Sequence, residues 1–451
     1  MNSKQTVKSI CLVTLGCSKN RVDSEHLLRQ VELYGINIIP DKFELDNGFT
    51  QNCDAIIINT CGFIKDAKVE SINAVFAAIN AKNNGLVKYV YVFGCLSQRY
   101  KNDLIKEIPE VDGFYGSFDT DSVLKAIGVE KNPFKLLERY VTTPKHYAYL
   151  KISEGCNRKC AYCSIPSIRG KHISVPIEDL VEEAKNLANK GVKELIVVAQ
   201  DTTYYGLDLY KKRSLATLLE ALCAIDGIEW IRLHYSYPAN FPRNVLKVMA
   251  SNPKICKYID IPLQHSSTKV LSAMKRNINA EDTQKLIDDF RKTVDGLVIR
   301  TTMIVGHPQE TKKDFDHLLS FVRNNKFERL GAFTYSHEEG TYGAKHYTDS
   351  IRESTKQKRL SLLMEVQAEI SYNCNQSMVG REEKMIVDSY SDGILYARCS
   401  TQSPEVDGET HIKTSALALN INYDQLVGKF ILVKIIGADE YDLQGEIIKI
   451  L

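Results

Sequence analysis

The sequence predicts an α/β protein of three units: a doubly wound parallel sheet over residues 7–140, a partial (β/α)6 barrel over 141–375, and a small antiparallel β-barrel over 376–451. Three observations support this prediction. Apolar strands alternate with helical segments through the first two units, which is typical of parallel sheets covered on both faces. Residues after 378 instead form short alternating strands separated by turns, which favours an antiparallel barrel. At 451 residues the chain is also too long for one core.

The composition is that of a soluble globular protein, with 44% hydrophobic and 25% charged residues. No apolar run reaches the ~18 residues of a membrane span, and the polar start of the chain lacks a signal-peptide core. We therefore expect a cytoplasmic protein with no membrane partner, in which the twelve cysteines are reduced and available as ligands. The net charge of +2 gives no global sign of nucleic-acid binding.

In the first unit, cysteines follow three predicted strands at 9–15, 54–59 and 89–93. Cys17, Cys61 and Cys95 each come just after the carboxyl end of one of these strands. In a parallel sheet these ends share one edge, where ligands bind, so we expect the three thiols to converge as a metal site. Each cysteine alone would more often be a buried small hydrophobe. We interpret four others as packing residues: Cys11, Cys53, Cys223 and Cys256.

In the second unit, a strand–helix pair repeats about six times, with strands at 147–152, 194–199, 230–235, 258–263, 297–305 and 330–335. Six repeats predict an open, partial barrel with functional residues at the carboxyl ends of its strands. Gln200 and Asp201 follow the second strand, Gln264 and His265 the fourth, and Gly306 the fifth. Loop solvation or helix capping is the alternative explanation for these residues.

The loop after the first barrel strand holds three cysteines within eight residues, Cys156, Cys160 and Cys163. Thiolates bind soft metals and iron–sulfur clusters, and spacing this tight lets one loop hold one corner of a cluster. No fourth cysteine lies nearby, so a four-iron cluster here would keep one iron open for a ligand. The alternative is a zinc site completed by His172 or another distant residue.

The tail from 379 to 451 is acidic, with 7 Lys and Arg against 12 Asp and Glu. A barrel that binds a nucleic-acid backbone should be basic. This tail suits a basic partner instead, such as a basic protein, unless its acidic face is merely solvated.

The cysteine loop, with Tyr162 before its last cysteine, has the spacing of radical S-adenosylmethionine (SAM) enzymes. Three segments of the first unit resemble the methylthiotransferase family among them: 14–20 (TLGCSKN), 59–64 (NTCGFI) and 94–96 (GCL). The tail, with SPEVDG at 403–408, is similar to their OB-like TRAM barrel. The resemblance covers nearly the whole chain.

One branch of that family modifies tRNA adenosine and the other an aspartate of ribosomal protein S-twelve. The chain resembles the second branch in residues 17–25 (CSKNRVDSE), 199–206 (AQDTTYYG), 261–265 (IPLQH) and 335–341 (YSHEEGT). Two departures are visible: Val175 replaces the usual Arg before Pro176, and His307 and Gln309 alter a Gly-Phe-Pro-Gly-Glu pattern. Neither removes a cysteine.

The resemblance implies two [4Fe-4S] clusters, one held by Cys156, Cys160 and Cys163 and one by Cys17, Cys61 and Cys95. SAM bound at the first open iron would give a 5′-deoxyadenosyl radical that removes hydrogen from the β-carbon of an aspartate in S-twelve. No ordinary base could do so, because an unactivated C–H lies far outside the pKa range of side chains. The second cluster would carry the sulfur, and a second SAM would supply the methyl group.

The residues expected to contact SAM are Tyr162, Gln200, Asp201, Gln264 and Arg300. A strand Arg on the surface is the alternative for the last of these. The implied partners are S-twelve on the small ribosomal subunit and an electron donor, with no direct nucleic-acid substrate.

Three rival functions stay open. A tRNA adenosine methylthiotransferase would change the mass of tRNA and not of S-twelve. A non-catalytic Fe-S ribosome-docking protein would give no 5′-deoxyadenosine from SAM. A plain radical methylase would hold about four irons per chain and not about eight, since each cubane holds four.

Overall fold

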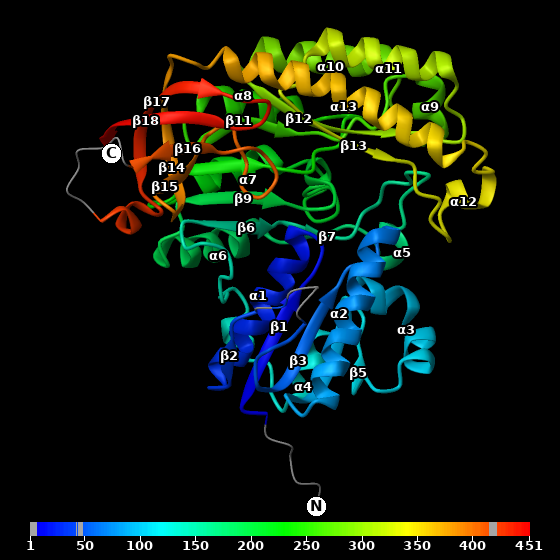
Figure 1. The fold of residues 1–451 in the computed structure, drawn as a ribbon, viewed down its shortest axis with the longest axis vertical. Coiled ribbons are helices and arrows are strands. Elements are labelled where there is room, and N and C mark those ends of the chain that lie inside the picture. The colour runs from blue at the N-terminus through cyan, green and yellow to red at the C-terminus, as the bar shows by residue number, and fades with distance from the viewer. Residues whose placement is uncertain (1–6, 42, 44–47, 415–421) are drawn as a thin grey trace, which may run out of the picture.

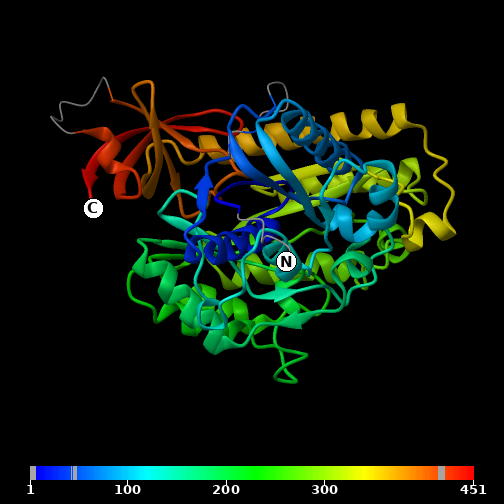
Figure 2. The ribbon, with the colours of Figure 1, turned by 90° about the horizontal axis from the view of Figure 1, so that it is seen from below.

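The computed structural model describes residues 7–41, 43, 48–414 and 422–451, and it contains the three predicted units. In Figure 1 the amino-terminal unit lies below the central six-stranded sheet, and the carboxyl-terminal barrel lies at the left of that sheet. Seen from below, the barrel lies at the upper left of the molecule and the amino-terminal unit lies nearer its centre (Figure 2). The α/β prediction is confirmed.

The amino-terminal sheet has five parallel strands in the order β2-β1-β3-β4-β5. This is a doubly wound order whose direction of winding changes between β1 and β3. The strands are β1 (Ser9–Thr14), β2 (Asn37–Ile39), β3 (Cys53–Thr60), β4 (Val87–Gly94) and β5 (Gly113–Phe114). Helices α1 (Ser18–Leu33) and α4 (Thr120–Ala126) cover one face, and α2 (Lys65–Asn83) and α3 (Cys95–Glu107) cover the other.

Alternate residues of these strands pack on opposite faces. In β1, Cys11 and Val13 belong to the core under α2 and α3, whereas Ile10 and Leu12 pack toward α1 and α4. A strand that is buried on both faces consists of a continuous run of apolar residues. This is why the positions of β1, β3 and β4 could be predicted from the sequence. The edge strands β2 and β5 have three and two residues and carry too little pattern to be recognised.

The core is an open sheet of six parallel strands in the order β13-β12-β11-β10-β9-β6. The strands are β6 (Tyr147–Lys151), β9 (Glu194–Val198), β10 (Trp230–Leu233), β11 (Ile255–Asp260), β12 (Val298–Val305) and β13 (Arg329–Thr334). Strand order follows chain order, as right-handed crossovers require, and the predicted partial barrel is confirmed.

Helices connect these strands and cover the outer face of the sheet. They are α6 (Ile177–Asn189), α7 (Leu215–Cys223), α8 (Arg243–Ser251), α9 (Thr268–Ala273), α10 (Ala280–Thr293) and α11 (Lys312–Asn325). The long helix α13 (Glu353–Gln376) packs on β13 and α11, and it crosses the top of Figure 1. Shorter elements are β7 (Ser153–Glu154), β8 (Ile173–Ser174), α5 (Ile165–Arg169), α12 (Tyr342–His346), and the 3-10 turns 133–135, 202–204 and 423–426.

The carboxyl-terminal unit is a closed five-stranded barrel in the order β14-β15-β16-β18-β17. Its strands are β14 (Glu382–Ser391), β15 (Ile394–Cys399), β16 (Thr410–Lys413), β17 (Phe430–Ala438) and β18 (Leu443–Ile450). The predicted antiparallel arrangement holds for four pairings, but β16 pairs with β18 in parallel and closes the barrel. β16 and β18 are not consecutive in the chain, and the alternation of apolar and polar residues in a strand does not show which strand it pairs with.

Buried ion pairs attach the amino-terminal unit to the core. Arg139 donates to Glu25 of α1 and, at 2.9 Å, to Glu183 of α6. All three side chains are almost completely buried. Removing charged groups from water is offset only when each charge has its partner in place. The two units must therefore dock with Arg139 next to both carboxylates.

The barrel contacts the core through a second polar network. Glu194, at the start of β9, accepts from Arg232 at 2.8 Å and from Arg398 of the barrel at 2.9 Å. His234 lies 2.9 Å from the Ser403 hydroxyl. Among the described residues, no helix has the length and apolar character that a membrane crossing requires.

Candidate active site

One cavity of about 360 Å³ lies between the amino-terminal unit and the core. Loops that follow strands of both sheets line it, so the carboxyl ends of the two sheets face each other across the space. The lining residues are Cys17, Lys19, Asn20, Cys61, Phe63, Cys95, Cys156, Arg158, Cys160, Tyr162, Cys163, Ile165, Arg169, Gln200, Tyr235, Ser236, Tyr237, Pro262, Gln264 and Arg276. All six cysteines predicted as ligands are among them.

The first trio of cysteines comes from three separate loops of the amino-terminal sheet. Cys17 follows β1 and precedes α1, Cys61 follows β3, and Cys95 opens α3 directly after β4. β1, β3 and β4 are adjacent in the sheet, and this adjacency brings together cysteines that are far apart in sequence. The predicted placement at one sheet edge is therefore what the structure has.

Two glycines allow these loops to approach so closely. Gly16 has φ +87°, and an added Cβ would lie 2.7 Å from the Cys61 Cβ. Gly94 has φ +104°, and an added Cβ would lie 2.6 Å from the Thr60 carbonyl oxygen. Both positions need a left-handed conformation and leave no room for a side chain, so each requires glycine.

The second trio comes from a single loop after β6. Backbone bonds from Cys156 N to Gly170 O (3.1 Å) and from Ala161 N to Met274 O (2.9 Å) fix the loop. Gly155, at φ +71°, lets the chain pass Lys171, whose carbonyl an added Cβ would overlap. The loop is thus held from both sides before any metal is bound.

Burial and mutual charge raise the pKa of most of these thiols. Burial, with smaller contributions from Cys17 and Cys95, raises the pKa of Cys61 to about 11. Burial also raises the pKa of Cys156 to about 11, with Asp201 and Cys160 contributing. At Cys17, burial is outweighed by Lys19, the Asn20 backbone N–H and Arg169, so its pKa is below the ordinary value.

A buried arginine donates to one sulfur of each trio. Arg169 Nε lies 3.2 Å from Cys95 Sγ, and Arg276 Nη1 lies 3.3 Å from Cys160 Sγ. Both side chains are at most 4% exposed. Hydrogen bonds to ligand sulfurs raise the reduction potential of iron–sulfur clusters, so each arginine suits a sulfur that carries negative charge.

Three of the five residues predicted to contact SAM line the cavity. Tyr162 lies in the cysteine loop with its hydroxyl 3.4 Å from Arg276 Nη1. Gln200 and Gln264 follow β9 and β11, and the side-chain oxygen of each is buried without a hydrogen-bond partner in the described structure. Gln264 has φ +76°, a strained value for a residue with a side chain.

The other two residues, Asp201 and Arg300, do not line the cavity. Asp201 accepts from Arg158 Nε at 2.7 Å and from the Thr203 backbone N–H at 2.9 Å. Arg300 donates to Asp260 at 3.0 Å and lies 3.6 Å from Asp407 of the barrel. Asp201 can still act on a ligand through Arg158, whereas Arg300 joins the core to the barrel.

The zinc alternative has no geometric support. Within the described residues no group of three or more His, Cys, Asp or Glu side chains is arranged to hold a single metal ion, and this applies to each cysteine trio as well as to a zinc site. His172, the suggested fourth zinc ligand, is absent from the cavity lining, and its Nε2 lies 3.1 Å from the Ser174 hydroxyl. A cubane spans more space than one ion, so trios of thiols around a cavity fit a cluster better.

Four cations of the lining were missed by sequence reasoning: Lys19, Arg158, Arg169 and Arg276. Lys19 and Arg158 each stand two residues after a cysteine predicted as a ligand, which is a signal that could have identified them. Arg169 and Arg276 reach the cavity only through the fold. The departures Val175 and His307 lie outside the lining, Val175 against the core and His307 between Tyr335 and Tyr347.

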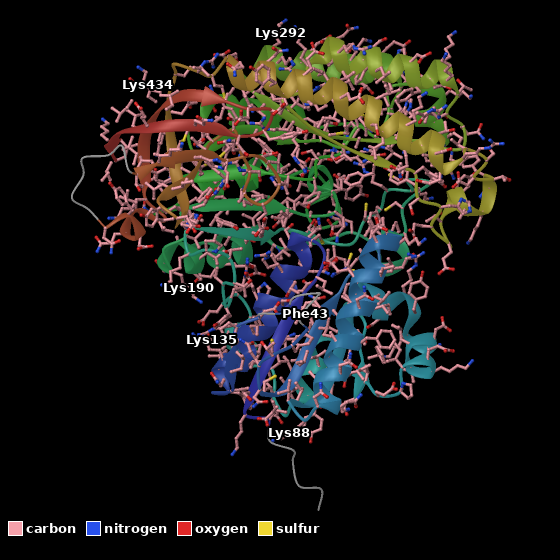
Figure 3. All side chains as sticks on the ribbon, in the orientation of Figure 1. Phe43, Lys88, Lys135, Lys190, Lys292 and Lys434 are labelled. Atoms are coloured by element: carbon pink, nitrogen blue, oxygen red, sulfur yellow. The ribbon has the colours of Figure 1, made fainter. Side chains whose placement is uncertain are left out.

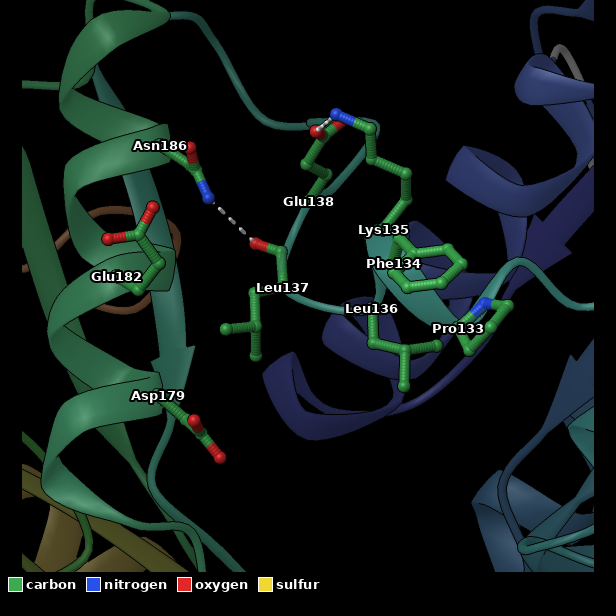
Figure 4. A pocket seen from close by; sticks show the side chains of 9 residues that line it. All are labelled: Pro133, Phe134, Lys135, Leu136, Leu137, Glu138, Asp179, Glu182 and Asn186. Atoms are coloured by element: carbon green, nitrogen blue, oxygen red, sulfur yellow. Dashed lines mark hydrogen bonds and ion pairs between the residues drawn. The ribbon is translucent and has the colours of Figure 1, made fainter.

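A larger hollow of about 550 Å³ lies elsewhere, between residues 133–138 and α6. Figure 4 shows its lining, including Phe134, Leu136, Asp179, Glu182 and Asn186. It has no cysteine or histidine, so it offers no ligands for the chemistry of the cysteine cavity.

Three family models match the chain. The Radical SAM superfamily matches residues 150–322, the Uncharacterized protein family UPF0004 matches residues 9–116, and the TRAM domain matches residues 379–448. The first two matches contain one cysteine trio each.

Proteins named ribosomal protein uS12 methylthiotransferase RimO resemble the chain over its full length. The protein of Flavobacterium johnsoniae is 49% identical over 447 residues, which are 99% of this chain and 100% of that protein. The protein of Cytophaga hutchinsonii is 48% identical over 100% of both chains. The protein of Bacteroides fragilis is 48% identical over 98% of this chain and 99% of its own.

Solved structures support the fold. The radical S-adenosylmethionine methyltransferase TsrM from Kitasatospora setae, with cobalamin and a [4Fe-4S] cluster bound, matches with a TM-score of 0.55 and 12% identity. The match covers 87% of this chain and 77% of that one. Its structure with tryptophan and a SAM analogue gives a TM-score of 0.54 over 72% of each chain.

Proposed function

The chain belongs to the family of ribosomal protein uS12 methylthiotransferases, and from this premise we propose that it adds a methylthio group to the β-carbon of an aspartate in uS12, giving 3-methylthioaspartate. The observation that carries the proposal is the single cavity lined by both cysteine trios. A substrate bound in this cavity would lie beside residues of both proposed cluster sites.

The radical SAM family implies a [4Fe-4S] cluster and SAM as cofactors. We assign the cluster to Cys156, Cys160 and Cys163, and a second [4Fe-4S] cluster to Cys17, Cys61 and Cys95. The donor sets fit, because each trio supplies three thiols and no further cysteine lines the described cavity. Each cluster would thus keep one iron free of protein ligands. When bound, these groups supply hydrogen-atom abstraction from an unactivated carbon, the inserted sulfur and the methyl group.

The site of SAM is supported by polar atoms left without partners. The side-chain oxygens of Gln200 and Gln264, the Ser236 hydroxyl, Arg158 Nη2 and Arg276 Nε are all buried, lie in lining residues and have no hydrogen-bond partner in the described structure. Buried polar groups are nearly always satisfied, so this group of atoms indicates a polar ligand. We propose that Tyr162, Gln200 and Gln264 contact it directly, and that Asp201 holds Arg158 in position.

The residues of the chain exclude water and orient the reactants. Phe63, Ile165, Tyr235 and Tyr237 supply apolar surface to the cavity, which protects reactive species from solvent. The Tyr235 backbone has φ +56° and is fixed by a hydrogen bond from its N–H to Asp260 at 3.0 Å. The strain thus lies beside the cavity, as is usual at functional sites.

A protein substrate agrees better with the charge of the barrel than RNA does. The acidic tail would repel a phosphate backbone and would attract a basic ribosomal protein. We propose uS12 in the small subunit as the macromolecular partner, together with an electron donor. The domain boundaries near 140 and 375 are part of this proposal, because the first separates the two trios.

The test is anaerobic incubation of the purified holoenzyme with SAM, a reductant and small ribosomal subunits, followed by mass measurement of uS12 and of tRNA. A methylthio increment on an aspartate of uS12 is the expected result. An increment on tRNA alone would favour the sister branch, and SAM left uncleaved would favour a docking protein. About four irons per chain, and not about eight, would remove the second cluster.

A further inference from the structure

The cavity is lined by four cations and by no carboxylate. Lys19, Arg158, Arg169 and Arg276 belong to the lining, and none of its described residues is Asp or Glu. A buried cation normally has an anionic or hydrogen-bonding partner. We therefore compared the ion pairs and hydrogen bonds of the four cations, because a cation without an anionic partner is the one most able to bind an anionic ligand.

Two of the cations are already paired with carboxylates. Arg169 is 2.8 Å from Asp23 and 3.2 Å from Glu154, and Arg158 is 2.7 Å from Asp201. Arg276 has no carboxylate but donates to Cys160 Sγ and to the Pro262 carbonyl oxygen. Arg276 therefore lies next to the loop trio and already donates to one of its sulfurs.

Lys19 forms no ion pair within the described structure, although it is only 7% exposed. Its Nζ lies 3.3 Å from the centre of the Tyr235 ring. Cys17 and Tyr235 act on the charge of Lys19 more strongly than Asp260 does. Asp260 is already bonded to Arg300 at 3.0 Å and to the Tyr235 backbone N–H at 3.0 Å. An ammonium group has three donors. The Tyr235 side chain also hydrogen-bonds to Lys19, which leaves the other donors available to a ligand.

Other lysines of the protein behave differently. In Figure 3 the labelled Lys88, Lys190, Lys292 and Lys434 lie at the outer edge of the molecule. Lys88 is 72% exposed and paired with Asp54. Lys19 is thus a buried cation of the cavity lining that has no carboxylate partner, and the Cys17 thiol, two residues before it, is the strongest charge that acts on it.

We propose that Lys19 binds the side-chain carboxylate of the target aspartate, and so selects aspartate and positions its β-carbon beside the amino-terminal trio. The inference rests on the proposed function and names the residue that recognises the substrate side chain. The carboxylate is bonded to the β-carbon, so an ammonium that fixes it also fixes the carbon that receives the sulfur. The Tyr235 ring holds the ammonium in place from the other side.

The experiment measures binding, not turnover. Holoenzyme with SAM is titrated with purified uS12 and with uS12 whose target Asp is replaced by Asn. We expect the wild-type enzyme to bind the aspartate form about 10- to 100-fold more tightly, the usual range for a hydrogen bond between charged groups. Lys19→Met should bind both forms equally, whereas Lys19→Arg should keep most of the preference.

The matched control is Arg21→Gln, which removes a cation two residues further along α1 that is paired with Glu405 at 3.2 Å and does not line the cavity. It should keep the full preference for aspartate. Iron content, measured for each variant, separates lost recognition from lost clusters, and binding is calculated per loaded enzyme.

The inference is overturned if Lys19→Met with full iron keeps the preference, or if the wild type has none. Should Lys19→Met fail to load, Lys19→Arg decides: with full iron and no preference it also overturns the inference. A wild type that prefers aspartate yet never modifies uS12 would contradict the proposed function and leave this recognition standing.

Discussion

The two cysteine trios reach one cavity by opposite routes. The loop trio, Cys156, Cys160 and Cys163, lies within eight residues and needs only a correctly folded loop. The sheet trio, Cys17, Cys61 and Cys95, needs β1, β3 and β4 to be adjacent and in register. A local site is therefore encoded by spacing, whereas a distributed site is encoded by the whole sheet, and the two should respond differently to perturbation.

Removing one cysteine from each trio should have the largest effect and tests directly whether the two trios have different roles. Cys156→Ala and Cys61→Ala should each lose about half of the iron, since one cubane of two is affected. Cys156→Ala should abolish SAM cleavage, whereas Cys61→Ala should keep it and lose only methylthiolation. Anaerobic iron and sulfide analysis with chromatography of 5′-deoxyadenosine measures both. Equal loss of cleavage in the two variants would mean that the trios do not act independently.

A glycine substitution should damage the sheet trio alone. Gly16→Ala forces a Cβ to within 2.7 Å of the Cys61 Cβ at φ +87°, so we expect loss of the iron bound by the sheet trio with the loop cluster retained. Gly35→Ala is the control, because Gly35 has φ +72° but open space around it. The control should cost about 1 kcal/mol of backbone strain and no iron. Iron loss in both variants would attribute the effect to backbone conformation, not to contact with Cys61.

Arg169 tests whether the two regions are coupled. Arg169→Gln leaves the partly buried carboxylates of Asp23 and Glu154 with Lys151 as their remaining ion-pair partner in the described structure. We expect a loss of about 3 kcal/mol, the lower end of the cost of breaking a buried ion pair. Urea denaturation followed by fluorescence measures the midpoint of the first transition. Arg243→Gln removes an exposed pair with Asp289 and should change stability by less than about 1 kcal/mol; a similar loss in both would refute the coupling.

Mild acid should weaken the core region by a smaller amount. Burial first, and His265 second, lower the pKa of His307 to about 4 from 6.5. The unfolded chain takes up the proton below pH 6.5 and the folded chain does not. Stability is therefore complete above pH 6.5 and falls as pH drops toward 4. About 1 kcal/mol should be lost between pH 7 and 5.5.

Thermal denaturation of wild type and His307→Phe across that range measures the effect of His307. The variant places an apolar ring between Tyr335 and Tyr347, which flank His307 edge-on. Its curve should therefore be flatter with pH. An unchanged slope would assign the acid sensitivity to another group, such as His234, whose pKa burial also lowers.

The sequence predicted the parts of this architecture that repeat or that are local. The strand ends carrying Cys17, Cys61 and Cys95 were predictable because a parallel sheet brings such ends to one edge. Arg276 was not, because it lies more than a hundred residues from the Cys160 sulfur that it contacts. For Arg300 the strand was predicted correctly, but the predicted contact with SAM was not found. Its side chain is directed to Asp260 and Asp407 instead. The contact with Asp407 of the barrel could not be predicted from either segment alone.

All five strands of the amino-terminal sheet come from one continuous segment of the chain, which matters for how the protein is made. Every strand that positions the sheet trio is translated by residue 114, before the codon for Cys156 is read. Domains fold in order as they leave the ribosome, so the cluster site proposed for Cys17, Cys61 and Cys95 can form on a nascent chain whose later half does not yet exist. If these cysteines hold the proposed cluster, its iron can be delivered while translation is still in progress.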